Sequence, residues 1–202
     1  MKLSLTLIIL LFLPISCTVS SNSEKNIREF LVELEIQAKE GNAIANFHLG
    51  NIYLNGLGGI EKQENKGAAY LLKAAEKGHT QAQYNLAATY KNGNGLPENQ
   101  ELALHWYLQA ATSGHAEAQL QAAMILQTNK EYFKAVELLK NSALQDIVDS
   151  QFFLAAAYHF GMGVPVNNRL AYIWYSIAAA NGDNDSLKQR DVTGKLLDKV
   201  TR

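Results

Sequence analysis

The stretch Ala82–Gly114, AQYNLAATYKNGNGLPENQELALHWYLQAATSG, has the clearest structural pattern in the chain. It predicts two short helices joined by a glycine-rich turn. The stretch Ser150–Gly182, SQFFLAAAYHFGMGVPVNNRLAYIWYSIAAANG, has the same pattern. Trp106 lies 68 residues before Trp174 (174 − 106), and the closing glycines of the two stretches have the same spacing. Because 68 is twice 34, the spacing predicts a solenoid of helical hairpins that repeat about every 34 residues.

The composition suits a compact helical protein. The chain has 202 residues, of which 48% are hydrophobic, and a formal net charge of −1. A length of this order predicts one or two domains. A net charge near zero gives no electrostatic basis for binding nucleic acid, so we expect no nucleic-acid partner. A single cysteine cannot form an intramolecular disulfide, and stability must therefore come from packing.

The first residues predict export. A lysine precedes the apolar run Leu3–Leu13, which is too short to span a bilayer and has the length of a signal-peptide core. We therefore predict that residues 1–17 are a signal peptide. The expected location is the periplasm or the surface of the cell envelope, on the outer membrane in a Gram-negative bacterium.

Two ways of removing this signal remain open. Cys17 follows Leu-Pro-Ile-Ser, which resembles a bacterial lipobox. The resemblance implies that Cys17 is acylated and tethers the mature protein to a membrane. The alternative is cleavage by an ordinary signal peptidase after Ser20 or Ser21. In either case residues 18–24 are expected to be a flexible tether.

Apolar periodicity divides the rest of the chain into hairpins and caps. The predicted segments are an N-terminal capping helix at 25–41, repeats at 42–78, 79–114, 115–147 and 148–182, and a C-terminal capping helix at 183–202. The third repeat has lost the glycine turn, which is replaced by Gln127–Lys130. It therefore looks closer to a tetratricopeptide repeat.

The repeated residues have clear structural tasks. Paired alanines let two helices approach closely, and Trp106 and Trp174 are expected to fill the gaps between hairpins. Truncating either tryptophan to alanine should then cost about 3–5 kcal/mol. Glycines with positive φ are expected where the first helix of a hairpin ends and the chain reverses, at Gly56, Gly58, Gly93, Gly95, Gly161 and Gly163.

These residues closely resemble the Sel1-like repeat, a relative of the tetratricopeptide repeat. Its pattern is roughly A-x-x-x-L-G-x-x-Y-x-x-G-x-G-V, a spacer, and K-A-x-x-W-Y-x-x-A-A-x-x-G. The second copy meets it at Ala82, Leu86, Tyr90, Gly93, Gly95, Ala103, Trp106, Tyr107, Ala110, Ala111 and Gly114. The fourth meets it at Leu154, Tyr158, Gly161, Gly163, Val164, Ala171, Trp174, Tyr175, Ala178, Ala179 and Gly182. The resemblance implies an all-α, right-handed α-α solenoid. Gly67 and Tyr70-Leu71 depart from the pattern in the first copy.

Motifs for chemistry are weak. Gly-x-Gly occurs three times, but each copy follows a predicted helix rather than a strand, which favours a structural turn over a phosphate loop. The five histidines show no metal-ligand spacing, and His79 and His115 share a place in the turn between repeats. We expect no catalytic residue, cofactor or metal. Sel1-like proteins linked to β-lactams carry regular cysteine pairs, which are absent here.

The family resemblance implies a non-catalytic scaffold that binds a segment of another protein in a concave groove, with the chain itself a monomer. Candidate groove residues on the first helix of each hairpin are Asn51, Ala88, Lys91, Met124 and His159. The row Phe47, Tyr84, Leu120 and Phe152 lines either the same groove or the packing between helices. The alternative functions are a cell-wall or β-lactam hydrolase and a structural subunit that binds polysaccharide or peptidoglycan.

Overall fold

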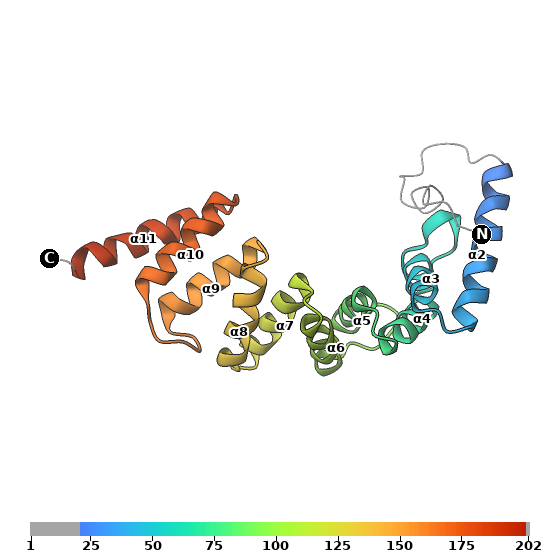
Figure 1. The fold of residues 1–202 in the computed structure, drawn as a ribbon, viewed down its shortest axis with the longest axis horizontal. Coiled ribbons are helices and arrows are strands. Elements are labelled where there is room, and N and C mark those ends of the chain that lie inside the picture. The colour runs from blue at the N-terminus through green and yellow to red at the C-terminus, as the bar shows by residue number, and fades with distance from the viewer. Residues whose placement is uncertain (1–20, 201–202) are drawn as a thin grey trace. The chain divides into compact units, whose positions relative to one another are not determined.

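The computed structural model describes residues 21–200, which form ten α-helices, one short 3-10 turn and no strand (Figure 1). The predicted signal peptide and Cys17 lie outside the described residues. The elements are α2 (Ser21–Lys39), α3 (Ala43–Asn55), η1 (Leu57–Gly59), α4 (Glu64–Glu76), α5 (Thr80–Asn92), α6 (Gln100–Thr112), α7 (Ala116–Thr128), α8 (Tyr132–Ala143), α9 (Val148–Phe160), α10 (Asn168–Ala180) and α11 (Asn184–Val200). None of these helices is long and apolar enough to cross a bilayer.

The chain forms two compact units, and the division between Trp106 and Tyr107 falls within α6. In unit 1, α3 packs on α2 and α4, and α4 packs on α5. In unit 2, each helix from α7 to α11 packs on the next one along the chain. Packing between sequential antiparallel helices is the arrangement expected of stacked hairpins. The predicted all-α fold is confirmed.

The turns follow the predicted glycine pattern. All six glycines that were expected to take positive φ do so, with φ between 67° and 79°. Gly56, Gly93 and Gly161 end α3, α5 and α9 in the left-handed conformation, and each donates its N–H to the carbonyl four residues earlier. This arrangement satisfies a carbonyl at the helix end and reverses the chain direction.

The second glycine of each turn is also required because the turn lies against the backbone of another helix. A Cβ on Gly95 would lie 2.4 Å from the backbone carbon of Glu64, at the start of α4. A Cβ on Gly163 would lie 2.4 Å from the backbone of Tyr132, at the start of α8. In both units, therefore, the turn rests directly on the first residues of a preceding second helix, where no side chain fits.

Gly67 departs from the repeat pattern because α3 and α4 approach unusually closely. A Cβ on Gly67 would lie 2.6 Å from the backbone nitrogen of Leu54 and 2.8 Å from the carbonyl oxygen of Gly50. Both neighbours are backbone atoms that cannot move aside independently. Only glycine therefore fits at position 67, where the other repeats have alanine.

In each aromatic pair the fully buried ring is the tyrosine and not, as predicted, the tryptophan. The fully buried rings are Tyr107 and Tyr175, which are 2% and 1% exposed, and burial raises the pKa of Tyr175 to about 12. Trp106 and Trp174 are only partly buried, although each packs against a core cluster as expected. The cost of about 3–5 kcal/mol for truncating a ring belongs to full burial, so it applies to the tyrosines rather than to the tryptophans.

The third repeat ends without a glycine. Gly41, Gly78, Gly114 and Gly182 close the other second helices with φ between 81° and 101°. Asp146 occupies the same place in the third repeat and has φ of 61°. Aspartate tolerates this region better than most residues, since its short side chain can bond locally, but it still pays a steric penalty that glycine avoids.

Gly67→Ala is expected to destabilise the protein by about 1–3 kcal/mol, because the new methyl group overlaps backbone atoms. In an open helix position the same change is stabilising, and Gly194→Ala supplies that control. The nearest atom to a Cβ at Gly194 is on the Tyr172 ring, 3.3 Å away, and Tyr172 is exposed enough to shift. Urea denaturation should show opposite signs for the two variants. Equal effects would contradict the close approach of α3 and α4.

Candidate functional site

The first helices of the hairpins, α3, α5, α7 and α9, are called A helices here, and α11 continues the series. Equivalent residues follow one another by 37, 36, 32 and 36 positions. The alignment takes as its reference the residue that directly precedes each helix: Asn42, His79, His115, Ile147 and Asp183. Four of the five accept a backbone N–H from the first turn through their side chains. His79 and His115 accept through Nδ1, which confirms their predicted place in the turns between repeats.

A buried amide recurs one turn into each A helix. Asn46, Gln83, Gln119 and Gln151 are at most 6% exposed. Each donates from its side-chain nitrogen to the carbonyl oxygen eight residues earlier, over 3.2 Å in every case. The sequence analysis missed this series, although its regular spacing was visible, because glutamine and asparagine are usually exposed.

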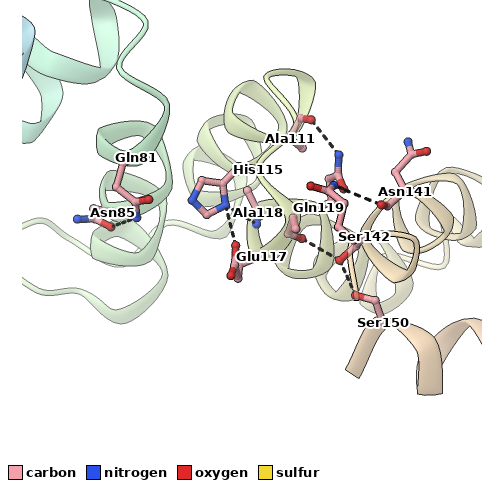
Figure 2. A network of polar contacts seen from close by, with 12 residues as sticks. Gln81, Asn85, Ala111, His115, Glu117, Ala118, Gln119, Asn141, Ser142 and Ser150 are labelled. Atoms are coloured by element: carbon pink, nitrogen blue, oxygen red, sulfur yellow. Dashed lines mark hydrogen bonds and ion pairs between the residues drawn. The ribbon is translucent and has the colours of Figure 1, made fainter. Parts of the chain in front are cut away.

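The amide oxygens differ between the two units. In unit 2, Gln119 accepts from Gln145 and Gln151 accepts from Asn181, both over 3.0 Å. In unit 1, the side-chain oxygens of Asn46 and Gln83 are buried and have no hydrogen-bond partner among residues 21–200. Figure 2 shows Gln119 within the polar network of unit 2. The polar network is thus more complete in unit 2.

The predicted groove residues fall into two sets of equivalent positions. Asn51, Ala88 and Met124 belong to one set, together with Ala156 and Val192. Lys91 and His159 belong to a second set, which continues at Lys195. Within the second set, Nδ1 of His159 lies 3.4 Å from Oγ1 of the buried Thr193 on α11, so the following helix partly covers His159.

In unit 1, the exposed surface of the A helices is rich in amides. Asn85 donates from Nδ2 to Oδ1 of Asn51 over 2.8 Å, which joins α5 to α3. Gln81 donates to Oδ1 of Asn85 over 3.1 Å. Lys91 is the single charged residue in α3 and α5. This surface therefore offers hydrogen-bond donors and acceptors but little charge.

The row of mostly aromatic residues at positions 47, 84, 120 and 152, for which two roles were possible, takes part in packing. Phe47 stacks on His79 with ring centroids 4.5 Å apart, Leu120 is 6% exposed, and Phe152 contacts the ring of Tyr175. Tyr84 is half-buried. These contacts favour the packing interpretation over a ligand-binding role.

A second polar cluster joins α2, α3 and α4. Tyr53 donates from its hydroxyl to Glu35 over 3.0 Å, and Nζ of Lys66 lies 3.8 Å from the centre of the Tyr53 ring. Tyr70 stacks on Tyr53, and burial, followed by the charge of Glu35, raises its pKa. This cluster ties the first cap to the first hairpin. Within residues 21–200, no group of three histidine, cysteine or carboxylate side chains could hold a metal ion.

Two histidines in unit 1 make its stability depend on pH. Burial lowers the pKa of His79 below its usual value of 6.5. Burial, and then the charge of His79, lowers the pKa of His48 as well. Nδ1 of His79 must be unprotonated to accept from Ala82. The stabilisation is thus complete above pH 6.5 and is lost as the pH falls through the lowered folded-state values.

His79→Asn should keep the cap, because Asn42 caps α3 through its side-chain oxygen. It should also weaken the loss of stability as the pH falls below 6.5, since one of the two titrating groups is gone. Thermal unfolding measured across this range checks the expectation. The control is His105→Asn on the exposed surface of α6. An unchanged pH profile for His79→Asn would contradict the assignment.

Comparison with known proteins identifies the repeats. Residues 43–79, 80–115 and 148–183 each match the Sel1 repeat family, and together they make up more than half of the chain. The third hairpin lies between the matched segments. Sel1 repeats generally serve as scaffolds for protein interactions.

Three relatives illustrate the match. The chitin synthase regulator SKT5 of Saccharomyces cerevisiae is 30% identical over 84% of this chain and 26% of its own length. A protective antigen of uropathogenic Escherichia coli, described as having an SLR fold, superposes with a TM-score of 0.70 at 35% identity, covering 79% of this chain and 35% of that one. A Sel1 repeat protein from Oxalobacter formigenes gives 0.66 at 27% identity, covering 84% and 48%.

The chain spans about a quarter to a half of the length of these relatives. The shared architecture confirms the predicted solenoid fold class. The matched repeats, the glycine turns and the superposed structures agree, and the chain belongs to the Sel1 repeat family.

Proposed function

We propose that this chain is a non-catalytic adaptor of the bacterial cell envelope, which binds segments of other proteins through the exposed positions of its A helices. The proposal gives the chain no reaction of its own. Its effect comes from holding a partner in place.

The observation that carries the proposal is an internal contrast between positions. The positions that build the scaffold are occupied by the same kinds of residue in every hairpin: small residues where helices approach, and a buried amide one turn into each A helix. The set Asn51, Ala88, Met124, Ala156 and Val192 instead holds an amide, two methyl groups, a thioether and a branched chain, of which Met124 and Val192 are exposed. A uniform scaffold with varied exposed positions is the pattern by which solenoids recognise different partners.

The relatives support the same interpretation. SKT5 is named as a regulator of an enzyme, which is a role for a protein that contacts another protein. The similarity covers most of this chain but only a quarter of SKT5, so it supports the interaction module and not a particular partner.

We further propose that the protein is exported and anchored through an acylated Cys17. The support is the apolar run Leu3–Leu13 and the lipobox-like residues before the cysteine. Metabolic labelling with a palmitate analogue should label the wild-type protein, and Cys17→Ser should abolish both the label and membrane retention. A protein that is exported but unlabelled would instead support cleavage near Ser20.

A photo-crosslinking amino acid placed at position 88 or 124 in intact cells tests the adaptor role. Both positions should give discrete adducts with a protein, since both belong to the same set on the A helices and neither is buried. The same residue at position 137 supplies the control, because Glu137 lies on α8, a second helix. Adducts that form equally from all three positions, or from none, would contradict binding through the A helices.

A further inference from the structure

We propose that the A-helix surface of unit 2 binds a basic, amphipathic α-helical segment of a partner. The proposal deepens the adaptor function given above and rests on it. It concerns α7, α9 and α11, which all lie within unit 2. The surface is called the Met124 face and consists of the exposed apolar residues Met124, Phe160, Val192 and Leu196, with the acidic residues Glu117, Asp149 and Asp185 along one edge.

Hydrogen bonds connect the three helices, through α8 between α7 and α9 and directly between α9 and α11. Oγ of Ser142 lies 2.9 Å from the carbonyl oxygen of Ala116, to which it donates, and 2.7 Å from Oγ of Ser150. This serine therefore joins the first turns of α7 and α9, and Figure 2 shows Ser142 beside Ser150. At their other ends, His159 of α9 contacts Thr193 of α11. The Met124 face thus belongs to one packed group of helices.

The apolar part of the face is unusually exposed. Phe160 is 64% exposed, Val192 is 50%, Met124 is 37% and Leu196 is 36%. Val192 and Leu196 are four residues apart, so they lie on the same side of α11. The equivalent positions in unit 1 are Asn51, Asn55 and Asn92 with Ala88, which are all polar or small, whereas in unit 2 only Ala156 and Thr128 are. Exposed side chains of this size, gathered at equivalent positions, mark a surface for an apolar partner.

The acidic edge is formed by a single set of equivalent positions. Glu117, Asp149 and Asp185 each lie in the first turn of their helix, whereas α3 and α5 have no acidic residue there. A carboxylate in the first turn stabilises its own helix through the dipole. That effect alone would serve α3 and α5 equally well, so it does not explain why, among the A helices, only those of unit 2 have an acidic residue there.

The neighbouring charges leave this edge acidic. Glu117 faces Nδ1 of His115 at 3.2 Å, and Asp185 faces Nζ of Lys188 at 2.9 Å. Asp149 has no ion-pair partner among the described residues. Lys195 lies in the C-terminal half of α11, away from the first turn that contains Asp185. A partner with lysine or arginine on one side would therefore find its complement along the edge that contains Asp149.

The chemistry favours a helix over an extended segment. An extended peptide needs side-chain partners for its backbone N–H and C=O groups, and the amides of unit 1 could supply them. The exposed apolar residues of the Met124 face cannot. A helix satisfies its own backbone and presents an apolar stripe to such a surface. Methionine adapts readily to the shape of the incoming side chains.

The size of the face sets the length of the partner segment. Packed helices lie about 8–10 Å apart, so crossing three of them spans about 20 Å. At about 1.5 Å per residue, this distance corresponds to a helix of about 14 residues.

The test uses three fluorescent peptides of about 14 residues. The first is an amphipathic helix with leucine on one face and lysine on the other. The second replaces lysine with glutamate. The third keeps the leucine and lysine composition but scrambles the order, so that no apolar face forms. Anisotropy at physiological salt should show binding of the first peptide at least about tenfold tighter than that of the others.

Two double variants locate the binding surface. Met124→Gln with Val192→Gln should weaken binding about tenfold, by removing apolar contacts. Glu117→Gln with Asp149→Asn should weaken it about threefold to tenfold and reduce its dependence on salt. The matched control is Leu144→Gln with Ile173→Gln, which alters an exposed apolar residue at the end of α8 and another on α10. It should leave binding unchanged, and circular dichroism verifies that every variant folds.

The outcomes separate this proposal from the adaptor function. If the scrambled or acidic peptide binds as well as the first, or if the face variants keep full affinity, the proposed partner chemistry is wrong. Crosslinked adducts from positions 88 and 124 would in that case still support an adaptor. A concentration-dependent dimer that Met124→Gln with Val192→Gln abolishes, measured by sedimentation, would instead assign the face to a second copy of the chain and overturn the proposal.

Discussion

One carbonyl oxygen near the end of α2, α4, α6 and α8 connects each of these helices to the A helix that follows. In the second repeat, the carbonyl of Ala111 accepts the backbone N–H of Gly114 at 3.0 Å and the side-chain amide of Gln119 at 3.2 Å. Both lone pairs of the oxygen are used. The first bond fixes the left-handed residue that ends one helix, and the second fixes the start of the next. The same pair of bonds recurs at Ala38, Ala75 and Ala143.

This pair of hydrogen bonds to one oxygen explains why buried polar residues are present in an alanine-rich core. An apolar side chain at position 119 would fill the space but would leave the direction of α7 less constrained. The C-terminal helix shows where the pattern stops, because Leu187 occupies the place of the amide in α11. Arg190 and Asp191, which form a salt bridge, occupy the next two equivalent positions. In the full repeats these positions hold a leucine and a small residue, against which the second helix packs. A polar surface at this point suits the end of a solenoid.

Repetition made most of the fold predictable. The spacing of the tryptophans and glycines was sufficient for the hairpins, the positive φ values and the place of His79. The features that sequence reasoning missed depend on contacts between segments. Nothing in the local sequence shows that Gly67 meets the backbone of α3, or that Tyr175 rather than Trp174 enters the core. The candidate site was predictable only as a set of positions, because the acidic and apolar character of the Met124 face emerges when three helices are aligned.

The third hairpin carries both of the non-glycine residues with positive φ among residues 21–200, Lys130 and Asp146. Each adds a steric cost that the glycines of the other hairpins avoid, of the order of 1 kcal/mol. These costs lower the free energy that is needed to open the third hairpin locally. Its transient opening would expose backbone to proteases. Replacing Lys130 or Asp146 by glycine would then lengthen the lifetime of the protein in a protease-containing cell, although neither residue belongs to the Met124 face.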